Sequence, residues 1–247
     1  MGKRFDQKTI LVAGASGGLG RALCTSLAAE GANIIALARN EGRLAETQAA
    51  VEAVGGRCLC VPFDLQNFAD YPQLFLALKD QIPHLDGLVH CAGSLDRCKP
   101  MQYIDFKEFR RMLDLHLTAP NMLTQSMLPL LKRAAHASVI FTTCEMAHAP
   151  KAHWHGYGLA KAALPDAASM WQMELPNLTI RFNSIDPGWM RTKLFQRAFV
   201  GLDIFKIAEP EQALSPFLYL LSDDSLSERG TLHGQAAAEA IGPQPTI

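Results

Sequence analysis

Short apolar runs alternate with longer amphipathic segments along the chain. The runs are rich in valine, isoleucine and other strand-forming residues, which is typical of buried strands. They cover residues 9–13, 33–38, 57–63, 87–91, 138–143 and 179–185. The segments between them carry apolar residues three and four positions apart, which predicts helices. The alternation predicts an α/β fold with a doubly wound, parallel sheet and helices on both faces.

Two of the expected helices bear on chemistry. One covers residues 104–133, and another covers 154–175 and holds both Tyr157 and Lys161. Pro165 removes the amide that would donate to the Lys161 carbonyl, so we expect a kink there. Shorter helices are expected over residues 21–30, 42–54, 71–80 and 214–221.

The first strand leads directly into a glycine-rich turn, G-A-S-G-G-L-G, from Gly14 to Gly20. Gly14 permits a tight turn, Gly18 lets the backbone approach a pyrophosphate, and Gly20 lets the next helix pack against the strand. The N-terminus of that helix offers free N–H groups to phosphate. An ordinary glycine-rich turn is the alternative, but the flanking strand and helix favour a dinucleotide site.

The second and third strands end at residues that suit the adenosine half of a dinucleotide. Arg39 follows Ala38 where an acidic residue would bind a ribose 2′-hydroxyl, so we expect NADP(H) to be preferred over NAD(H). A solvated arginine is the alternative. Asp64 and Leu65 follow the third strand and are expected to contact adenine, although Asp64 could instead cap the next segment.

Tyr157 and Lys161 lie four residues apart in an alanine-rich segment, so they share one face of the expected helix. A lysine ammonium beside a phenol stabilises the phenolate and lowers the tyrosine pKa. Tyr157 is therefore a candidate acid/base. Taken alone the spacing is weak, because any amphipathic helix can place tyrosine and lysine this way.

Several of these features come directly after a predicted strand. The carboxyl ends of parallel strands meet at one edge of the sheet, where the ligand crevice lies. We therefore expect one site to gather residues 14–20, Arg39, Asp64, Ala92, Gly93, Cys144, Pro187 and Gly188, with Tyr157 and Lys161 beside them.

Composition narrows the class of protein. The 247 residues are 49% hydrophobic with no linker-like break, which predicts a single domain over residues 1–247. The formal net charge of −1 gives no basic face for nucleic acid, and we expect neither a membrane partner nor a signal peptide, hence a cytoplasmic protein. Six cysteines without C-x-x-C spacing predict reduced, mostly buried thiols.

Two further segments invite a role. His148, His153 and His155 with Glu145 resemble metal ligands, but their spacing lacks a third ligand in register, so no metal is expected. Residues 190–208 mix phenylalanine, leucine and basic residues. A membrane-surface helix is one interpretation, but a substrate lid after the Pro-Gly turn is the one we favour.

The ordered motifs resemble the short-chain dehydrogenase/reductase family over nearly the whole chain, and within it the YciK-like group of bacterial oxidoreductases. The motifs are A-G-A-S-G-G-L-G, Asp64 after the third strand, C-A-G at 91–93, Y-G-L-A-K at 157–161, N-S-I-D-P-G at 183–188 and S-D-D-S at 222–225.

The resemblance implies a Rossmann fold with about seven strands, a homodimer or homotetramer, and hydride transfer between nicotinamide and a small carbonyl or alcohol. It implies that Tyr157 gives the proton and that Lys161 holds the nicotinamide ribose and lowers the tyrosine pKa. The cofactor contacts that it implies are Gly14, Ser16, Gly18, Leu19, Gly20, Arg39, Asp64, Leu65, Ala92, Gly93, Tyr157, Lys161, Pro187, Gly188 and Thr192.

Two positions depart from the family pattern. Cys144 stands where the resemblance implies a catalytic serine, and His116 where it implies an asparagine. A thiol is a poorer hydrogen-bond donor, and near Lys161 it could ionise and repel a developing oxyanion. His116 could relay protons through water or carry a charge. Thr143 could supply a hydroxyl if the register shifts by one residue.

These observations support two hypotheses. The first is an NADP(H)-dependent oxidoreductase acting on a small carbonyl/alcohol pair, with Tyr157, Lys161, Cys144 and His116 in the catalytic centre. The second is an NADP(H)-binding regulatory or sensing protein in which Cys144 and His116 have weakened or abolished catalysis.

Overall fold

Every strand that the apolar runs predict is present in the computed structural model, which describes residues 3–95 and 97–234. Strand ends differ from the predicted ones by at most one residue. A short additional strand, β7, is too brief to produce a readable pattern in the sequence. The strands are β1 (Thr9–Ala13), β2 (Asn33–Ala38), β3 (Arg57–Pro62), β4 (Gly87–His90), β5 (Ala137–Thr142), β6 (Ile180–Asp186) and β7 (Leu232–Gly234).

The seven strands form one parallel sheet in the order β3-β2-β1-β4-β5-β6-β7. The chain winds outward from β1 to β3, then crosses to β4 and winds in the other direction. The order therefore reverses between β1 and β4, which is where doubly wound sheets open a crevice for a ligand. This is the predicted Rossmann fold of a single domain.

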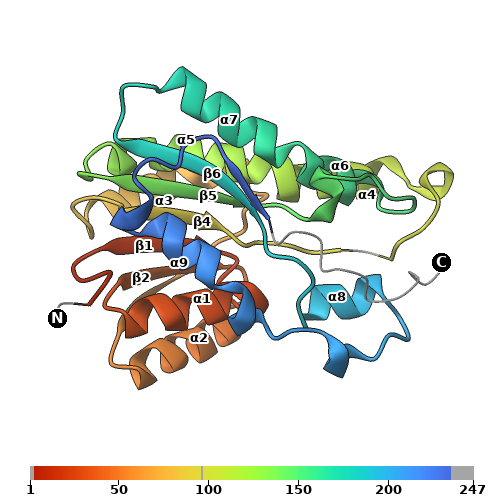
Figure 1. Cartoon of the computed structure of the whole chain (residues 1–247), viewed down its shortest axis with the longest axis horizontal. Coiled ribbons are helices and arrows are strands. Elements are labelled where there is room, and N and C mark those ends of the chain that lie inside the picture. The colour runs from red at the N-terminus through yellow and green to blue at the C-terminus, as the bar shows by residue number, and fades with distance from the viewer. Residues whose placement is uncertain (1–2, 96, 235–247) are drawn as a thin grey trace.

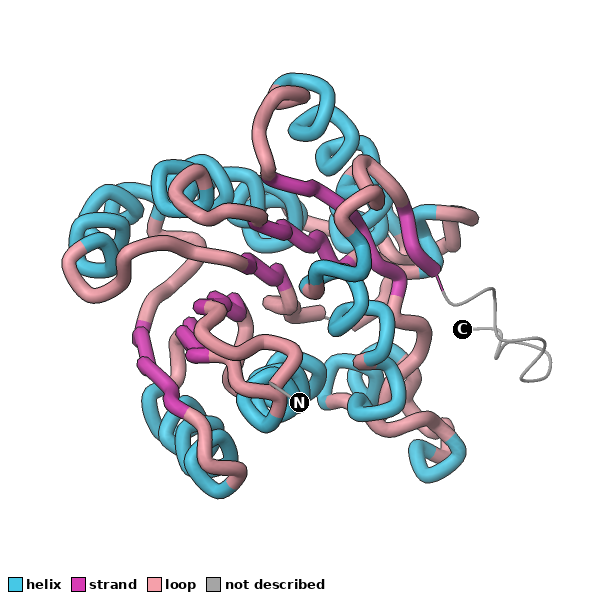
Figure 2. Tube along the Cα trace, turned by 60° about the vertical axis from the view of Figure 1, so that its left-hand side comes forward, coloured by secondary structure: helices cyan, strands magenta, loops and turns pink. Residues whose placement is uncertain are grey.

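Helices cover both faces of the sheet (Figures 1 and 2). One face packs against α1, α2 and α9, and the other against α3, α5 and α7. The α-helices are α1 (Gly18–Ala29), α2 (Glu41–Ala53), α3 (Tyr71–Lys79), α4 (Phe106–Leu113), α5 (Ala119–Leu131), α6 (His155–Ala162), α7 (Leu164–Glu174), α8 (Lys193–Ala198) and α9 (Ser215–Leu221). Short 3₁₀ turns are η1 (Phe68–Asp70), η2 (Met101–Tyr103), η4 (Glu145–Ala147), η5 (Ile204–Lys206), η6 (Pro210–Ala213) and η7 (Asp223–Ser225).

The single helix expected over residues 104–133 is wrong in detail. Helix α4 begins at Phe106, because the Asp105 side chain accepts a hydrogen bond from the Glu108 amide and caps it. A π-helical turn, η3 (Asp114–Thr118), then separates α4 from α5. Such turns are frequent at functional sites, and this one carries His116.

Where a kink is expected at Pro165, the helix is divided into two. Helix α6 ends at Ala162 and α7 begins at Leu164. The Lys161 carbonyl, which lacks an amide donor from Pro165, accepts a hydrogen bond from the Thr143 hydroxyl at 2.6 Å. The proline thus ties the end of β5 to the helix that carries Tyr157 and Lys161.

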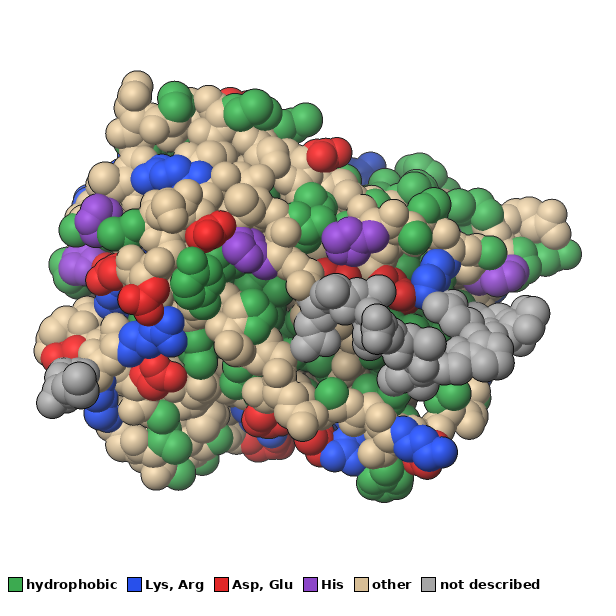
Figure 3. Space-filling view, viewed as in Figure 1, with side chains coloured by type: hydrophobic (Ala, Val, Ile, Leu, Met, Phe, Trp, Pro, Cys, Tyr) green, Lys and Arg blue, Asp and Glu red, His purple; other side chains and the backbone are tan. Residues whose placement is uncertain are grey.

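The structure agrees only in part with what composition predicts about surface charge, membrane helices and cysteines. Acidic and basic side chains are interspersed on the face in Figure 3. Over residues 3–95 and 97–234, no helix has the length and apolarity to cross a membrane. All six cysteines are free, but only Cys24 is buried and the rest are half-buried, so the expectation of mostly buried thiols is wrong.

Both the backbone conformation and the close approach of Ala92 exclude a side chain at Gly14. Its φ is +90°, and a Cβ there would lie 2.4 Å from the Ala92 amide nitrogen. Gly55 has a similar φ of +78° but open space around it. We expect Gly14→Ala to destabilise the protein by about 3 kcal/mol or more, and Gly55→Ala by about 1 kcal/mol, since only the first adds overlap to backbone strain. Urea unfolding of both variants measures this, and equal losses would contradict it.

Candidate active site

A cavity of about 310 Å³ follows the carboxyl edge of the sheet. The glycine turn lies at one end and Tyr157 at the other. The expected residues that line it are Gly14, Ser16, Gly18, Leu19, Arg39, Asp64, Leu65, Ala92, Gly93, Cys144, Tyr157, Lys161, Pro187, Gly188 and Thr192. The structure thus brings together nearly all the residues that the strand ends and motifs singled out.

Two expected site residues do not line the cavity. Gly20 lies on α1, where a Cβ would be 2.3 Å from the Gly14 carbonyl oxygen, so it allows close packing of helix and turn. His116 lies behind the cavity wall and is fully buried. Its ring packs edge-on against Tyr157 with 4.8 Å between ring centroids.

The glycine turn is held by side chains that the sequence did not single out. Thr47, fully buried on α2, donates a hydrogen bond to the Ala15 carbonyl at 2.8 Å. Arg21 on α1 donates to the Ser16 carbonyl at 3.3 Å and to the Thr47 hydroxyl at 3.1 Å. These bonds fix the turn from two helices, and no local sequence pattern links residues so far apart.

The end of the cavity that is expected to hold adenosine carries two arginines. Arg39 is 63% exposed and lies 3.8 Å from the Asp64 carboxylate. Arg43, on α2, lies over Gly17, where its guanidinium would be 2.5 Å from a Cβ. Asp64 also accepts a hydrogen bond from the Gln66 amide at 3.0 Å, while the next helical turn begins after Asn67, so Asp64 does not cap it and its adenine contact stays a prediction. Arg43 was missed, because Arg39 precedes the N-cap Asn40 and no helical spacing links the two arginines.

Lys161 is buried and its hydrogen bonds are defined. Its Nζ donates to the Thr142 carbonyl at 2.6 Å, and burial lowers its pKa. The Thr143 hydroxyl is occupied with the Lys161 carbonyl. Thr143 also lines the cavity, but this hydrogen bond uses the proton that Thr143 would need to donate in place of the missing serine hydroxyl.

Tyr157 is only 6% exposed, at the inner end of the cavity. Burial raises the pKa of its phenol well above the usual value, and the neighbouring Cys144 and Asp186 raise it further. The expectation that Lys161 lowers the tyrosine pKa does not describe this state of the site. Desolvation is the largest cause of the raised pKa of Tyr157, and the Lys161 ammonium donates its hydrogen bond to the Thr142 carbonyl.

Cys144 adjoins Tyr157 and lines the cavity. Burial raises the pKa of its thiol to about 11, although Lys161 acts in the opposite direction. The thiol is therefore protonated at neutral pH, and the thiolate alternative is wrong. A neutral thiol leaves a weak donor beside the tyrosine and no repelling charge.

His116 is a neutral histidine. Its Nε2 lies 2.7 Å from the Ser94 carbonyl oxygen, which requires a donated proton, and burial followed by the charge on Lys161 lowers its pKa to about 3. The expectation that it could carry a charge is wrong. Its Nδ1 is buried without a hydrogen-bond partner in the described part of the chain.

Buried neutral histidines make the fold sensitive to acid. Burial lowers the pKa of His90, like that of His116, from 6.5 to about 3. The unfolded chain therefore binds protons first, and stability falls as pH drops from about 6.5 towards 3. We expect the melting temperature to fall over this window, and to fall less for His116→Asn than for the exposed-site control His136→Asn. Parallel acid profiles of the two variants would contradict this expectation.

Asp186 is a site residue that the sequence analysis passed over. It is 5% exposed at the end of β6, lines the cavity, and accepts a hydrogen bond from the Gly188 amide at 2.9 Å. Its second oxygen lies 3.7 Å from His148 Nε2. Burial raises the pKa of the carboxyl. The carboxylate thus shapes the Pro187-Gly188 turn and places an acid near Tyr157.

The histidine-rich loop forms no cluster of ligands. Over residues 3–95 and 97–234, no three or more His, Cys, Asp and Glu side chains come together as a metal site would require. His155 lies buried at the start of α6. His148 instead faces Asp186.

Comparison with known proteins identifies the family. The model of the family described as short chain dehydrogenase matches residues 8–201. This chain belongs to the short-chain dehydrogenase/reductase family. It is therefore an oxidoreductase of the NAD(P)-dependent short-chain dehydrogenase/reductase type.

Similar proteins include the YciK group predicted from the motifs. The oxidoreductase YciK of Escherichia coli strain K12 is 31% identical over 229 residues, covering 92% of this chain and 90% of that protein. A short chain dehydrogenase from Shigella flexneri 2a, complexed with NADP, is 30% identical with a TM-score of 0.91, covering 95% of this chain and 99% of its own. One from E. coli CFT073, complexed with NADPH, is 30% identical with a TM-score of 0.90, covering 95% and 98%. The resemblance to the YciK group is confirmed.

Proposed function

We propose that this protein transfers a hydride between NADP(H) and a small carbonyl/alcohol pair, with Tyr157 as acid/base and Lys161 as its partner. One observation carries the proposal: Tyr157, Lys161 and the glycine turn line the same cavity. If Tyr157 and Lys161 served only to pack the helix, they would not be expected to line the same cavity as the glycine turn.

The residues present fit a dinucleotide. Gly17 and Gly18 expose bare backbone to the cavity, and Gly18 begins α1, whose N-terminal amides favour phosphate. Pro187, Gly188 and Thr192 also line the cavity, with Thr192 beside Gly18, and would contact the nicotinamide half. When bound, the nicotinamide supplies the hydride acceptor or donor.

The chain's own residues then handle the proton. Tyr157 Oη would donate it to the substrate oxygen during reduction and take it back during oxidation. Lys161 would stabilise the phenolate that remains, because a buried ammonium favours an adjacent anion. The Cys144 thiol would offer the substrate oxygen a weak hydrogen bond.

Cofactor preference rests on the two arginines at the adenosine end. Arg39 and Arg43 would both face a 2′-phosphate, which a guanidinium binds well and which NAD(H) lacks. We expect Arg39→Ala to weaken NADPH binding by about tenfold and to leave NADH binding nearly unchanged. Calorimetric titration with both cofactors checks this. Arg197→Ala, an exposed lid variant that does not line the cavity, is the control, and an equal loss for both cofactors would contradict the preference.

Turnover tests the proposal itself. The wild-type protein with NADPH is given a panel of ketones, diketones and quinones while the absorbance of the reduced nicotinamide is followed. Consumption that depends on the carbonyl compound supports the proposal. Tight NADPH binding with no consumption across the panel would favour the sensing alternative.

We further propose that the protein acts in the cytoplasm as a homodimer or homotetramer. The family resemblance supports the assembly. Residues 190–208 would act as the substrate lid, with α8 as its helical part.

A further inference from the structure

Four aromatic side chains form a continuous surface beside Tyr157, which we call the aromatic wall: Trp154, Trp189, Phe195 and Phe199. All four line the cavity. The ring centroids of Trp154 and Phe199 lie 5.7 Å apart, those of Trp189 and Phe199 5.0 Å, and those of Phe195 and Phe199 4.6 Å. The wall therefore joins Trp154 to residues 189–199, which begin 35 positions later in the sequence.

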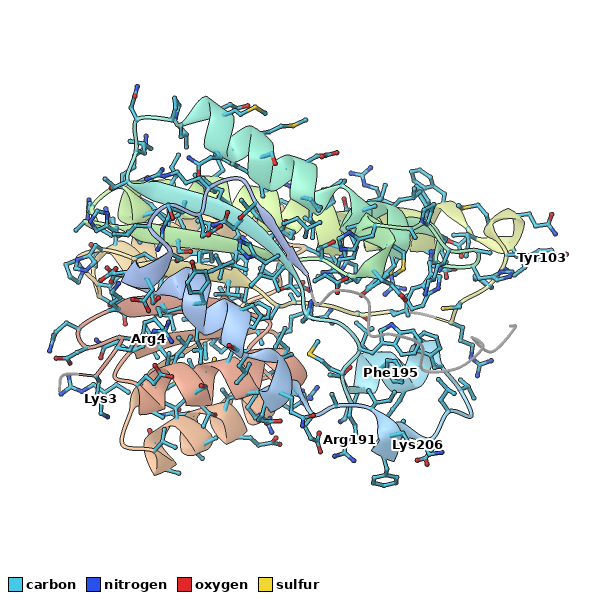
Figure 4. All side chains as sticks on the ribbon, in the orientation of Figure 1. Lys3, Arg4, Tyr103, Arg191, Phe195 and Lys206 are labelled. Carbon is cyan, nitrogen blue, oxygen red and sulfur yellow. The ribbon has the colours of Figure 1, made fainter. Side chains whose placement is uncertain are left out.

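The aromatic wall reaches the catalytic tyrosine directly. The centroid of Trp154 lies 5.6 Å from that of Tyr157. Phe195 lies on α8, with Arg191 and Lys206 on the side of this region away from the sheet (Figure 4). A flat molecule whose oxygen meets Tyr157 would thus have aromatic surface alongside it as far as the lid helix.

Trp189 is held in place from outside the wall. Its indole Nε1 donates to the Glu145 carboxylate at 3.1 Å, and Lys151 lies 2.5 Å from the other Glu145 oxygen. The Lys151 ammonium also lies over the Trp189 ring, 5.6 Å from its centroid. A ring fixed by a hydrogen bond and a cation–π contact is pre-organised to receive a ligand.

Charge near the wall disfavours an anionic substrate. The acidic groups that line this part of the cavity are Glu145, paired with Lys151, and Asp186. Lys161 donates to the Thr142 carbonyl. The other cations on the described lining are the exposed Lys193 and the two arginines at the adenosine end. A carboxylate or phosphate beside Asp186 would meet repulsion in a partly desolvated site.

We propose that the substrate is an uncharged, flat carbonyl compound with fused aromatic or alicyclic rings, rather than a short aliphatic ketone or an anionic acyl compound. This inference rests on the proposed function and names the substrate class of the same site. The ring system lies along the aromatic wall, and the carbonyl oxygen meets Tyr157. The carbonyl carbon gains a hydride from the nicotinamide, and its oxygen gains the Tyr157 proton.

Three matched ketones test the substrate class at saturating NADPH: 2-acetonaphthone, 6-acetyl-2-naphthoate and 2-butanone. We expect kcat/KM for 2-acetonaphthone to exceed that for 2-butanone by about 50-fold and that for the carboxylate by about tenfold. Equal or better use of 2-butanone or of the carboxylate would overturn the inference while leaving the proposed function intact.

Variants locate the effect on the wall. Phe199→Ala is expected to lower kcat/KM for 2-acetonaphthone by about tenfold and to leave that for 2-butanone within about twofold. Phe205→Ala is the matched control, because Phe205 is 80% exposed in the same segment and lies outside the cavity. Equal losses for both ketones in Phe199→Ala would overturn the role of the wall.

Binding without turnover separates this inference from the proposed function. Two of the three tryptophans, Trp154 and Trp189, belong to the wall, while Trp171 stacks on Phe182 elsewhere. In Tyr157→Phe loaded with NADPH, 2-acetonaphthone is expected to quench tryptophan fluorescence saturably, and 2-butanone is not. Saturable quenching in this variant, together with no consumption of any ketone by the wild-type protein, would sustain the wall and contradict the proposed hydride transfer. Absence of quenching would overturn the wall.

Discussion

Tyr157→Phe is expected to lower NADPH consumption by about 10³-fold and to leave NADPH binding nearly unchanged. The substitution removes only the hydroxyl that would exchange the proton, and general acid–base groups of this kind contribute about 10²- to 10⁴-fold. The ring stays, so its contacts with His116 and Trp154 persist. Steady-state rates together with calorimetric titration of NADPH measure both effects.

Tyr103→Phe is the control for that change, since Tyr103 is 67% exposed and does not line the cavity. It should retain wild-type rates. If Tyr157→Phe kept more than about a tenth of the activity, another group would have to supply the proton, and the assignment of Tyr157 would be wrong.

Cys144→Ser is expected to raise kcat by about tenfold to a hundredfold. A hydroxyl donates a stronger hydrogen bond than a thiol, and one well-placed donor at a developing oxyanion is worth about 10²- to 10³-fold. The pKa of about 11 for the Cys144 thiol means that the change replaces one neutral donor by another. KM for the ketone should move less than kcat, because the interaction strengthens as charge develops on the oxygen.

Cys98→Ser provides the comparison, because Cys98 is a half-buried thiol in the same apolar cluster but outside the cavity lining. It should leave kcat unchanged. A lower kcat in Cys144→Ser would indicate that this chain has adapted its geometry to sulfur, and the account of Cys144 as a weak donor would be wrong.

The position of the site was predictable because the sequence shows where the strands end. Apolar runs such as residues 33–38 and 138–143 stop where the sheet stops, and parallel strands present their carboxyl ends on one edge. Arg39, Cys144 and Pro187 could therefore be placed together before any coordinates were known. Their arrangement around a cavity follows from topology and not from the identity of any one side chain.

What the sequence concealed depends on contacts between distant segments. The π-helical turn that carries His116 does not interrupt the spacing of apolar residues, so residues 104–133 were predicted as one helix. Arg43 and Thr47 contact the glycine turn from α2. The hydrogen bond between Thr47 and Ala15, for example, joins residues 32 positions apart. Burial also reversed three electrostatic expectations, at Tyr157, Cys144 and His116, because desolvation is a property of the folded site.

The aromatic wall was hidden for the same reason. Phe199 was expected in the substrate lid, but no pattern in the sequence links it to Trp154 or Trp189. Only the packing of the lid helix against the loop before α6 makes them one surface. Substrate preference in this fold therefore emerges from tertiary contacts, and sequence patterns alone do not encode it in readable form.

Isotope transfer tests the central claim most directly. The wild-type protein is incubated with a ketone and NADPH deuterated at nicotinamide C4, and the alcohol product is analysed by mass spectrometry. The account predicts that the product carries one deuterium on the carbinol carbon, delivered by one face of the nicotinamide. NADPH that binds tightly while no alcohol forms, or an alcohol that carries no deuterium from either C4 position, would contradict hydride transfer at the Tyr157 centre.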